Sequence, residues 1–520
     1  MATEAAAETV AVSGSAASSE IVHKGLKRDA IGYISNVVIG VASTAPAYSL
    51  AATLGFIVAD PGVGVHAPAV LLVSFIPMLL VASAYKYLNR ADPDAGTTFA
   101  WTTRAFGPSF GWLNGWAIFL ADVLVMASLS AIAAIYTFKL FGFTELGESK
   151  AAEVIAAILW IVLMTWICYR GIELSARVQR YLLTFEVIAL VIFAIVALVK
   201  VYTGHPSGAI QPEASWFNPF DMNFKDLLVA LLLGIFLYWG WDSGVSVNEE
   251  SEDPNEGPGR AAVVSTVLLV VIYLVVSSGA QAFHGVGFIS NEQNSEDVIN
   301  ALGKPVFGGG VVGWVLVHAL ILCVLTSASA STQTTILPTA RTTLSMAHWK
   351  SIPGVFGTVH KRYLTPTAST LGFGAISIAI TVPLLLLSTS VLEDSLIALG
   401  IPVCLYYGTT GFACAAYYRH ELTKSVRNFL LLGVGPVVGG LIFYGIGVYA
   451  IYFYGKAENA ENQSLAGITL PLWFGVGGMI LGAILMLISR PYFREFFSRK
   501  RETCPKGMLG QPVERAPLHL

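Results

Sequence analysis

The sequence predicts an all-α polytopic membrane protein with about twelve transmembrane helices. Asp, Glu, Lys and Arg make up only 12% of the 520 residues, whereas they make up about 25% of a typical soluble domain. The hydrophobic fraction is 55% and the mean hydropathy is +0.67. Apolar runs long enough to cross a bilayer recur along the chain, and residues 261–283 and 468–489 carry no charge at all.

Twelve runs meet the length requirement of a membrane helix, which is roughly 20 mostly apolar residues. In chain order they are 31–58, 68–88, 111–140, 153–169, 176–202, 227–249, 261–283, 312–346, 367–388, 394–417, 428–454 and 468–489.

The basic residues predict how these spans are oriented. If the chain starts in the cytoplasm and crosses twelve times, 24 of the 30 Lys and Arg residues fall on the cytoplasmic side and 6 fall outside. Cytoplasmic loops of membrane proteins carry such an excess, and a span count wrong by one would destroy it. We therefore expect both termini in the cytoplasm.

Spans and charges divide the chain into four regions. Residues 1–30 are polar and rich in Ala and Ser, and they lack the apolar core of a signal peptide, so we expect a disordered cytoplasmic tail. Residues 31–417 hold the first ten spans, and residues 428–489 hold two peripheral spans. Residues 490–520 are expected to form a basic cytoplasmic tail.

Composition and motifs argue against several function classes. A net charge of −3 and a pI of about 6.3 argue against a nucleic-acid partner. The five cysteines have no zinc-ligand spacing and imply no disulfide framework. The sequence has no P-loop, and Arg419-His420-Glu421-Leu422 is not a HExxH zinc site. We therefore expect neither an enzyme nor a cofactor.

Span 1 carries a proline in its middle, in the segment VVIGVASTAPAYSLAATLGF. Proline inside a helix removes a backbone hydrogen bond, but it is well tolerated at the first helical position. Ser43 or Thr44 would then act as the N-cap of a second half-helix that starts at Pro46. We predict an unwound link around residues 42–45; a simple proline kink is the alternative.

Span 6 is also interrupted, because Gly240 and Gly244 flank the intramembrane acid Asp242. Such helices line a cavity, since bare backbone cannot face lipid. Spans 1 and 6 begin the two halves of a five-plus-five arrangement. Interrupted spans at corresponding positions indicate the substrate site of a secondary transporter.

The segment YWGWDSGVSVNEESEDPNEGPGRA, in and after span 6, resembles the amino acid–polyamine–organocation permeases. The matching positions are Tyr238, Trp239, Gly240, Trp241, Asp242, Glu249, Glu250, Pro254, Pro258, Arg260 and Ala261. GIELSARVQR resembles the family's entry into helix 5, and SASASTQTTILPTARTTLSMA resembles its helix 8. The resemblance implies a leucine-transporter-type fold, with an inverted repeat of helices 1–5 and 6–10 and two peripheral helices.

The resemblance also implies a substrate site at the two breaks. The carboxylate of an amino acid would meet backbone N–H groups of residues 43–45, at the positive end of the second half-helix. The amino group would meet carbonyl groups near residues 39–41 and 238–240, and Trp239 and Trp241 are candidate gates, although packing is the commoner role of a membrane Trp. The full predicted set is Ile39, Gly40, Val41, Ala42, Ser43, Thr44, Ala45, Tyr238, Trp239, Gly240, Trp241 and Asp242.

The sequence departs from the family in helix 5. Many proton-coupled members place there a Lys that stands in for a sodium ion, and the matching position here is Glu186. A carboxyl group away from water can bind and release a proton, so Glu186 is predicted to carry the coupling proton; ligation of a cation is the alternative. Thr326 and Ser327 resemble the hydroxyl pair of sodium-coupled relatives, although such hydroxyls also bond to helix backbone.

A further acid, Asp122, lies about halfway along span 3. A charge at that depth is functional by default. Asp122 is predicted to recognise a cationic group of the substrate or to relay a proton. The alternative is a structural pair with Asn114 or His318.

Two acids at the cytoplasmic end of span 6, Glu249 and Glu250, are candidates for an inner gate. We expect them to form ion pairs with Lys27, Arg28 or Arg260.

Together these features predict a proton-coupled permease that imports amino acids by alternating access. Its partners would be an amino acid or amine, a proton or sodium ion, and the lipid bilayer. The buried acids leave open a polyamine or cationic amino acid permease or exchanger, and a non-transporting nutrient sensor could use the same fold. Short tails without a signal sequence favour the plasma membrane, specifically a bacterial inner membrane.

Overall fold

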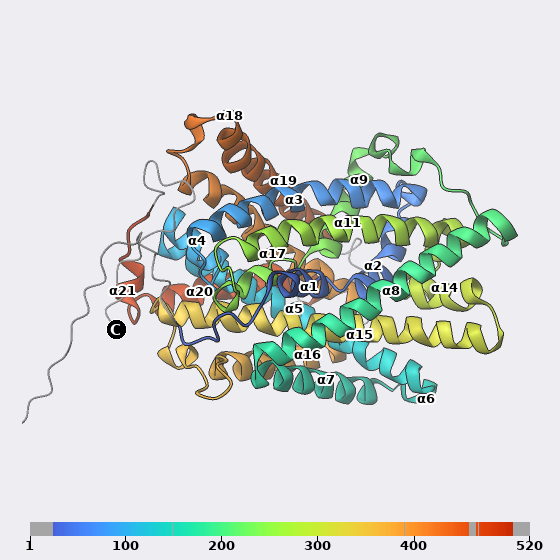
Figure 1. Cartoon of the computed structure of the whole chain (residues 1–520), viewed down its shortest axis with the longest axis horizontal. Coiled ribbons are helices and arrows are strands. Elements are labelled where there is room, and N and C mark those ends of the chain that lie inside the picture. Colours follow the sequence, from blue (N-terminus) through green and yellow to red (C-terminus); the bar gives the residue numbers. More distant parts are fainter. Residues whose placement is uncertain (1–23, 148, 389–390, 457–463, 466, 503–520) are drawn as a thin grey trace, which may run out of the picture.

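The computed structural model describes residues 24–147, 149–388, 391–456, 464–465 and 467–502. In this part of the chain, twelve helical segments are long and apolar enough to cross a membrane. Figure 1 shows the long helices running roughly along the long axis of the molecule. The predicted all-α fold with twelve spans is confirmed, and each predicted span overlaps one observed span.

The observed spans begin and end within a few residues of the predicted limits. They are α1 (Tyr33–Ser43) with α2 (Pro46–Ala59), η1 (Gly64–His66) with α3 (Ala67–Ala91), α5 (Pro108–Phe141), α7 (Lys150–Arg170), α8 (Ile172–Gly204), α9 (Phe224–Tyr238) with α10 (Ser243–Ser246), α11 (Gly257–His284), α15 (Gly310–His348), α16 (Thr367–Leu387), α17 (Val391–Tyr417), α18 (Val426–Asn428) with the π-helix η7 (Phe429–Val434) and α19 (Gly435–Tyr454), and α20 (Leu470–Ser489).

Short elements connect the spans, and one of them, α21, follows the last span. They are α4 (Thr98–Phe106), α6 (Thr144–Gly147), η2 (Ala214–Phe217), η3 (Pro219–Asp221), η4 (Asn248–Glu250), α12 (Val286–Ile289), α13 (Glu292–Ser295), α14 (Val298–Phe307), η5 (Gly354–Gly357), η6 (Leu422–Lys424), the strands β1 (Ser464–Leu465) and β2 (Ile468–Thr469), and α21 (Arg494–Phe497). The two strands pair antiparallel.

Small residues let the spans approach each other closely. Helix α17 packs against α19, and a Cβ on Gly411 would lie 2.3 Å from the carbonyl oxygen of Pro436. Close backbone approach of this kind drives helix association in membranes, where the hydrophobic effect contributes little. Helix α5 packs against both α15 and α17 at the centre of the molecule.

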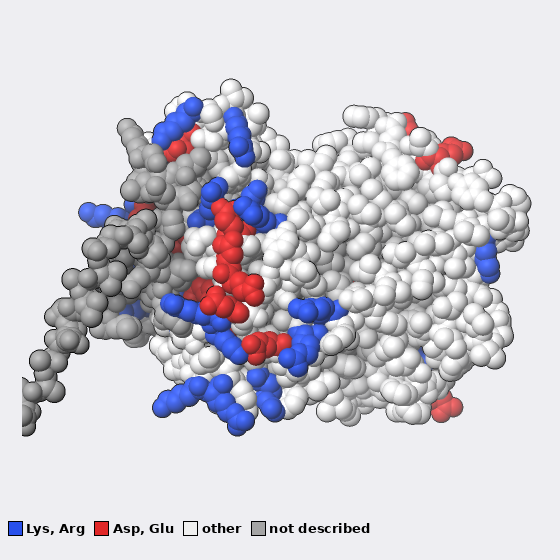
Figure 2. Space-filling model, in the orientation of Figure 1, with Lys and Arg blue, Asp and Glu red and all other residues white. Residues whose placement is uncertain are grey.

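The exposed side chains are distributed as expected for a membrane protein. Large apolar side chains are exposed on α7 and α8, among them Ile155, Leu159, Ile188 and Ile195. Figure 2 shows few charges over the middle of the molecule and a concentration of Lys, Arg, Asp and Glu toward the end that holds α4 and α21. In the described part of the chain, every ion pair joins two segments predicted to lie on the same side of the membrane.

Parts of both predicted tails are described, whereas residues 1–23 and 503–520 lie outside the described residues. Lys24 and Leu26 are buried. The backbone N–H groups of Ala30 and Ile31 both donate to the carbonyl oxygen of Glu250, at 2.9 and 3.0 Å. The segment before α1 is therefore attached to the segment that follows α10.

The segment after α20 packs under α4. Phe496 is fully buried and its ring stacks on Phe99, with centroids 5.8 Å apart. Glu502 forms an ion pair with Arg104, and its backbone N–H donates to the Arg104 carbonyl at 2.7 Å. Arg104 also pairs with Asp92 at 2.6 Å.

Candidate functional site

The break in span 1 lies where the proline position predicts it. Helix α1 ends at Ser43, α2 begins at Pro46, and Ala45 between them has a left-handed backbone with φ 47°. The N–H groups of Thr44 and Ala45 donate to the carbonyls of Val41 and Ala42, each at 3.2 Å. The link is therefore a tight turn whose N–H groups are bonded to the end of α1.

The break in span 6 lies directly beside it. Helix α9 ends at Tyr238, Trp239 is extended, and Gly240 has φ 116°. The Ser43 and Ser243 hydroxyls are 2.7 Å apart, and the Ser43 carbonyl accepts a hydrogen bond from Ser331 of α15 at 2.8 Å. The two links thus meet in the protein interior, as the five-plus-five arrangement predicts.

Gly240 is required at this meeting point. A Cβ there would lie 2.9 Å from the Ser43 carbonyl oxygen, and φ 116° strains any L-residue. We expect Gly240→Ala to lower the free energy of unfolding by about 1–3 kcal/mol, measured as a lower thermal unfolding midpoint in detergent. Gly142→Ala is the matched control, because Gly142 has φ 71° and open space around it. An equal loss in both variants would contradict crowding at the break.

Glu186 of α8 caps the second half-helix. Its Oε1 accepts hydrogen bonds from the Ala47 N–H at 2.8 Å and from the Ser327 hydroxyl at 2.7 Å. Ser327 in turn accepts from the Tyr48 N–H at 3.2 Å. Side chains of α8 and α15 thus bind N–H groups in the first turn of α2 in place of a local N-cap. The predicted N-cap role of Ser43 or Thr44 is wrong, because Ala45 holds the N-cap position and the Thr44 hydroxyl donates to the Val41 carbonyl.

The second oxygen of this carboxyl group, Oε2, has no hydrogen-bond partner among the described residues, and the Glu186 side chain is fully buried. Thr326 differs from Ser327, because its hydroxyl bonds back to the Cys323 carbonyl of its own helix at 3.0 Å. No group of three or more His, Cys, Asp and Glu residues suited to a metal ion occurs in the described segments.

Asp242 is held by tyrosines of α17. Its Oδ1 accepts a hydrogen bond from the Tyr407 hydroxyl at 2.8 Å, and its Oδ2 lies 3.4 Å from the Tyr406 hydroxyl. The Trp241 ring stacks on Tyr407 with centroids 5.3 Å apart. Trp239 donates its indole N–H to Tyr406. The acid and both tryptophans were predicted from the sequence, whereas neither tyrosine was.

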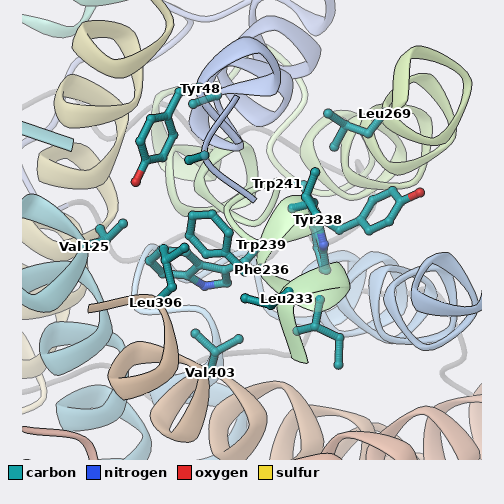
Figure 3. Close-up of a cluster of buried hydrophobic side chains, with 14 of the residues drawn as sticks. Tyr48, Val125, Leu233, Phe236, Tyr238, Trp239, Trp241, Leu269, Leu396 and Val403 are labelled. Atoms are coloured by element: carbon teal, nitrogen blue, oxygen red, sulfur yellow. The ribbon is translucent and has the colours of Figure 1, made fainter. Parts of the chain in front are cut away.

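Figure 3 shows how the aromatic side chains of the span 6 break are arranged. Tyr238 and Trp239, although adjacent in sequence, point in opposite directions. Tyr238 donates to the Leu71 carbonyl of α3 at 3.0 Å. Tyr48 of α2 packs edge-on against Phe236 at 6.3 Å, and its hydroxyl has no partner in the described structure.

Asp122 of α5 has Thr339 of α15 as its hydrogen-bond donor. This partner differs from the predicted Asn114 and His318. The Asn114 amide donates to the Phe110 carbonyl at 2.8 Å, and His318 contacts the Trp314 carbonyl at 2.9 Å.

A buried group of charges lies between the two breaks and the end of the molecule that holds α4. We call it the inner charge cluster, and it consists of Lys24, Asp94, Glu249, Glu250 and Arg341. Lys24 pairs with Asp94 at 2.9 Å and with Glu249. Arg341 binds both carboxylate oxygens of Glu250, at 2.9 and 3.0 Å. Two acids are thus in an inner charge network as predicted, but the observed cations Lys24 and Arg341 were not among those expected.

Lys24 joins segments that come from opposite halves of the chain. Replacement by Met removes the cation between Asp94 and Glu249, so we expect the cytoplasmic end to open more often. Ser345, which donates to Asp94 at 2.5 Å, offers a reporter position. In a Cys504→Ser, Ser345→Cys background, Lys24→Met should raise the rate of labelling by a membrane-impermeant maleimide by at least about fivefold in inside-out vesicles.

Lys27→Met is the control for this labelling experiment, because Lys27 pairs with Glu173 at 2.7 Å and both side chains are exposed. Equal labelling rates in the two variants would rule out a gating role for Lys24.

Comparisons with known proteins all lead to amino acid permeases, transporters or antiporters. The family model described as "Amino acid permease" matches residues 30–475. An arginine/ornithine antiporter of Latilactobacillus sakei is 22% identical over 454 residues, which cover 81% of this chain and 89% of the antiporter. The large neutral amino acids transporter small subunit 2 of Homo sapiens is 24% identical, over 71% of this chain and 66% of the relative. The Asc-type amino acid transporter 1 of Mus musculus is 24% identical, over 61% and 59%.

Proposed function

The chain belongs to the amino acid permease family, and from this premise we propose that it is a secondary active transporter that imports amino acids by alternating access. The observation that carries the proposal is the meeting of two interrupted spans at Ser43 and Gly240. Backbone links inside a membrane are stable only where protein or a water-filled cavity surrounds them, and they lie at the substrate sites of such transporters.

The substrate in this proposal binds at the two links. The amino acid carboxylate lies at the positive end of α2, near residues 43–45, and the amino group lies near the carbonyls of residues 39–41 and 238–240. The Thr44 and Ala45 N–H groups are bonded to α1 in this structure, so carboxylate binding at these groups requires the turn to open. Trp239 and Trp241 cover the site from the side of span 6.

We propose that transport is coupled to protons and that Glu186 carries the proton. This carboxyl group contacts α2 and α15 from α8, so its protonation state acts on the half-helix that flanks the substrate site. Its unpartnered oxygen is the atom at which a proton binds. We also propose a location in the plasma membrane with both termini in the cytoplasm; the excess of basic residues on one side supports this orientation.

A second candidate function is the exchange of cationic amino acids. Asp242 and Asp122 are buried carboxyl groups on spans 6 and 3, which both pack against α15 and α17. A buried acid is a natural partner for a substrate cation. One relative is named as an arginine/ornithine antiporter.

Uptake into proteoliposomes tests both functions. Labelled neutral and cationic amino acids are supplied separately under an imposed proton gradient, an imposed sodium gradient, or no gradient, with protein-free liposomes as the control. Accumulation under the proton gradient supports the proton-coupled permease. Counterflow of cationic amino acids without gradient-driven accumulation supports the exchanger, and binding without either kind of flux would contradict transport.

A further inference from the structure

A pocket rich in arginine lies where α7 turns into α8, at the end of the molecule that holds the inner charge cluster. Its volume is about 280 Å³. We call it the basic pocket, and its charged lining residues are Lys27, Arg170, Glu173, Arg177 and Arg362. Three regions of the chain contribute to it: the segment before α1, the α7–α8 corner and the loop after η5.

The positive charge of the basic pocket is largely uncompensated. Its acid, Glu173, pairs with Lys27 at 2.7 Å. Arg170, Arg177 and Arg362 form no ion pair with any residue that the structure describes. Four cations against one anion leave three positive charges in a small space, which favours an anionic ligand.

Aromatic rings contact two of the three guanidinium groups, those of Arg170 and Arg362. Arg170 lies over the rings of Trp166 and Tyr363, at 5.1 and 5.3 Å from their centroids, and Arg362 lies 5.6 Å from the Tyr363 centroid. Stacked guanidinium groups lose little freedom when they bind, and they fit the oxygens of a phosphate group. The first turn of the 33-residue helix α8 also lines the pocket, and its partial positive charge adds to that of the side chains.

The pocket adjoins a surface that faces lipid. Trp166 is 49% exposed and Tyr181 is 72% exposed. Leu163 and Leu174 are also exposed on the same two helices. Exposed aromatic rings beside the ends of spans mark the level of lipid headgroups. A ligand with a phosphate in the pocket would therefore have its apolar part against α7 and α8.

From the uncompensated charge, the stacked arginines and the adjoining apolar surface, we infer that the basic pocket binds the phosphate headgroup of an anionic phospholipid. Basic pockets between spans on the cytoplasmic side of a membrane recognise such headgroups. Figure 2 shows Lys and Arg side chains gathered with a few acids at this end of the molecule, next to an uncharged surface. Binding at this pocket does not depend on the transport function.

Native mass spectrometry of the full chain in detergent tests the inference. The probes are phosphatidylglycerol, phosphatidylcholine with the same acyl chains, and inorganic phosphate. We expect the wild type to bind phosphatidylglycerol more tightly than phosphatidylcholine. The triple variant Arg170→Gln, Arg177→Gln, Arg362→Gln should lose about 10- to 100-fold in affinity for phosphatidylglycerol and keep its affinity for phosphatidylcholine.

Two further variants complete the experiment. Arg419→Gln, Arg427→Gln, Arg494→Gln removes the same charge from cytoplasmic positions outside the basic pocket and should change the affinity less than twofold. Glu173→Gln removes the acid and should strengthen phosphatidylglycerol binding about threefold or more; it decides the question if the pocket triple variant does not fold. Unchanged binding in both pocket variants would overturn the inference, as would equal binding of phosphate without a lipid tail.

Discussion

Replacing Arg341 by Met is expected to lower the free energy of unfolding by about 3–5 kcal/mol. The Arg341 and Glu250 side chains are 1% and 0% exposed, and two hydrogen bonds join them. Removing the arginine leaves a buried carboxylate without its cation, and that charge is far more costly than the lost contact. Thermal unfolding of the purified protein in one detergent measures the effect.

Two variants separate a buried charge from a general loss of packing. The double variant Arg341→Met, Glu250→Gln removes both charges, and most of the stability should return. Lys350→Ala breaks an exposed pair with Glu495, whose side chains are 42% and 60% exposed, and should cost no more than about 1 kcal/mol. If Arg341→Met is no more damaging than Lys350→Ala, the inner charge cluster does not hold the fold together.

Glu186→Gln is expected to abolish proton-driven accumulation while leaving exchange intact. The amide carbonyl can still accept hydrogen bonds from Ala47 and Ser327, so α2 keeps its cap. The amide cannot bind and release a proton, so the proton gradient can no longer drive accumulation of the substrate. Because each pH unit is worth ~1.36 kcal/mol, a gradient of about two units sustains roughly 100-fold accumulation at one proton per substrate. This accumulation should disappear in the variant, and counterflow should stay within about twofold of wild type.

Glu186→Ala is the structural counterpart of this experiment. It removes the cap as well as the proton site, and we expect a loss of about 0.5–2 kcal/mol in stability together with slower counterflow. Full proton-driven accumulation in Glu186→Gln would show that the coupling proton binds elsewhere.

The fold was readable from the sequence because membrane spans are long and uniform. Runs of about 20 apolar residues set the number of spans, and Pro46 and Gly240 marked the two breaks, since each residue has a strong and local effect on the backbone. The family resemblance also identified Glu186 as a candidate carrier of the coupling proton and Ser327 as part of a hydroxyl pair like that of sodium-coupled relatives. The structure brings both residues to the first turn of α2.

The partners of the buried charges could not be predicted from the sequence. Glu249 meets Lys24 from 225 positions away, and Asp242 meets Tyr407 from 165 positions away. Local sequence patterns do not encode which faces of two distant helices meet. Arg341 is one of the 24 basic residues that were counted on the cytoplasmic side, although it lies near the end of the predicted span 312–346. An arginine in the last turns of a span has the same local sequence pattern whether it faces water or a buried acid.

The segment that packs under α4 affects how the protein is made. During synthesis, Arg104 cannot form its ion pair with Glu502 until that residue, 398 positions later in the chain, has been added. Ribosomes add about 5–20 residues per second, so roughly 20–80 s pass between the synthesis of these two residues. During this time Phe99 lacks the ring that stacks on it. A chain that stops early would expose this apolar surface, and chaperones or proteases that bind such surfaces could distinguish unfinished molecules from finished ones.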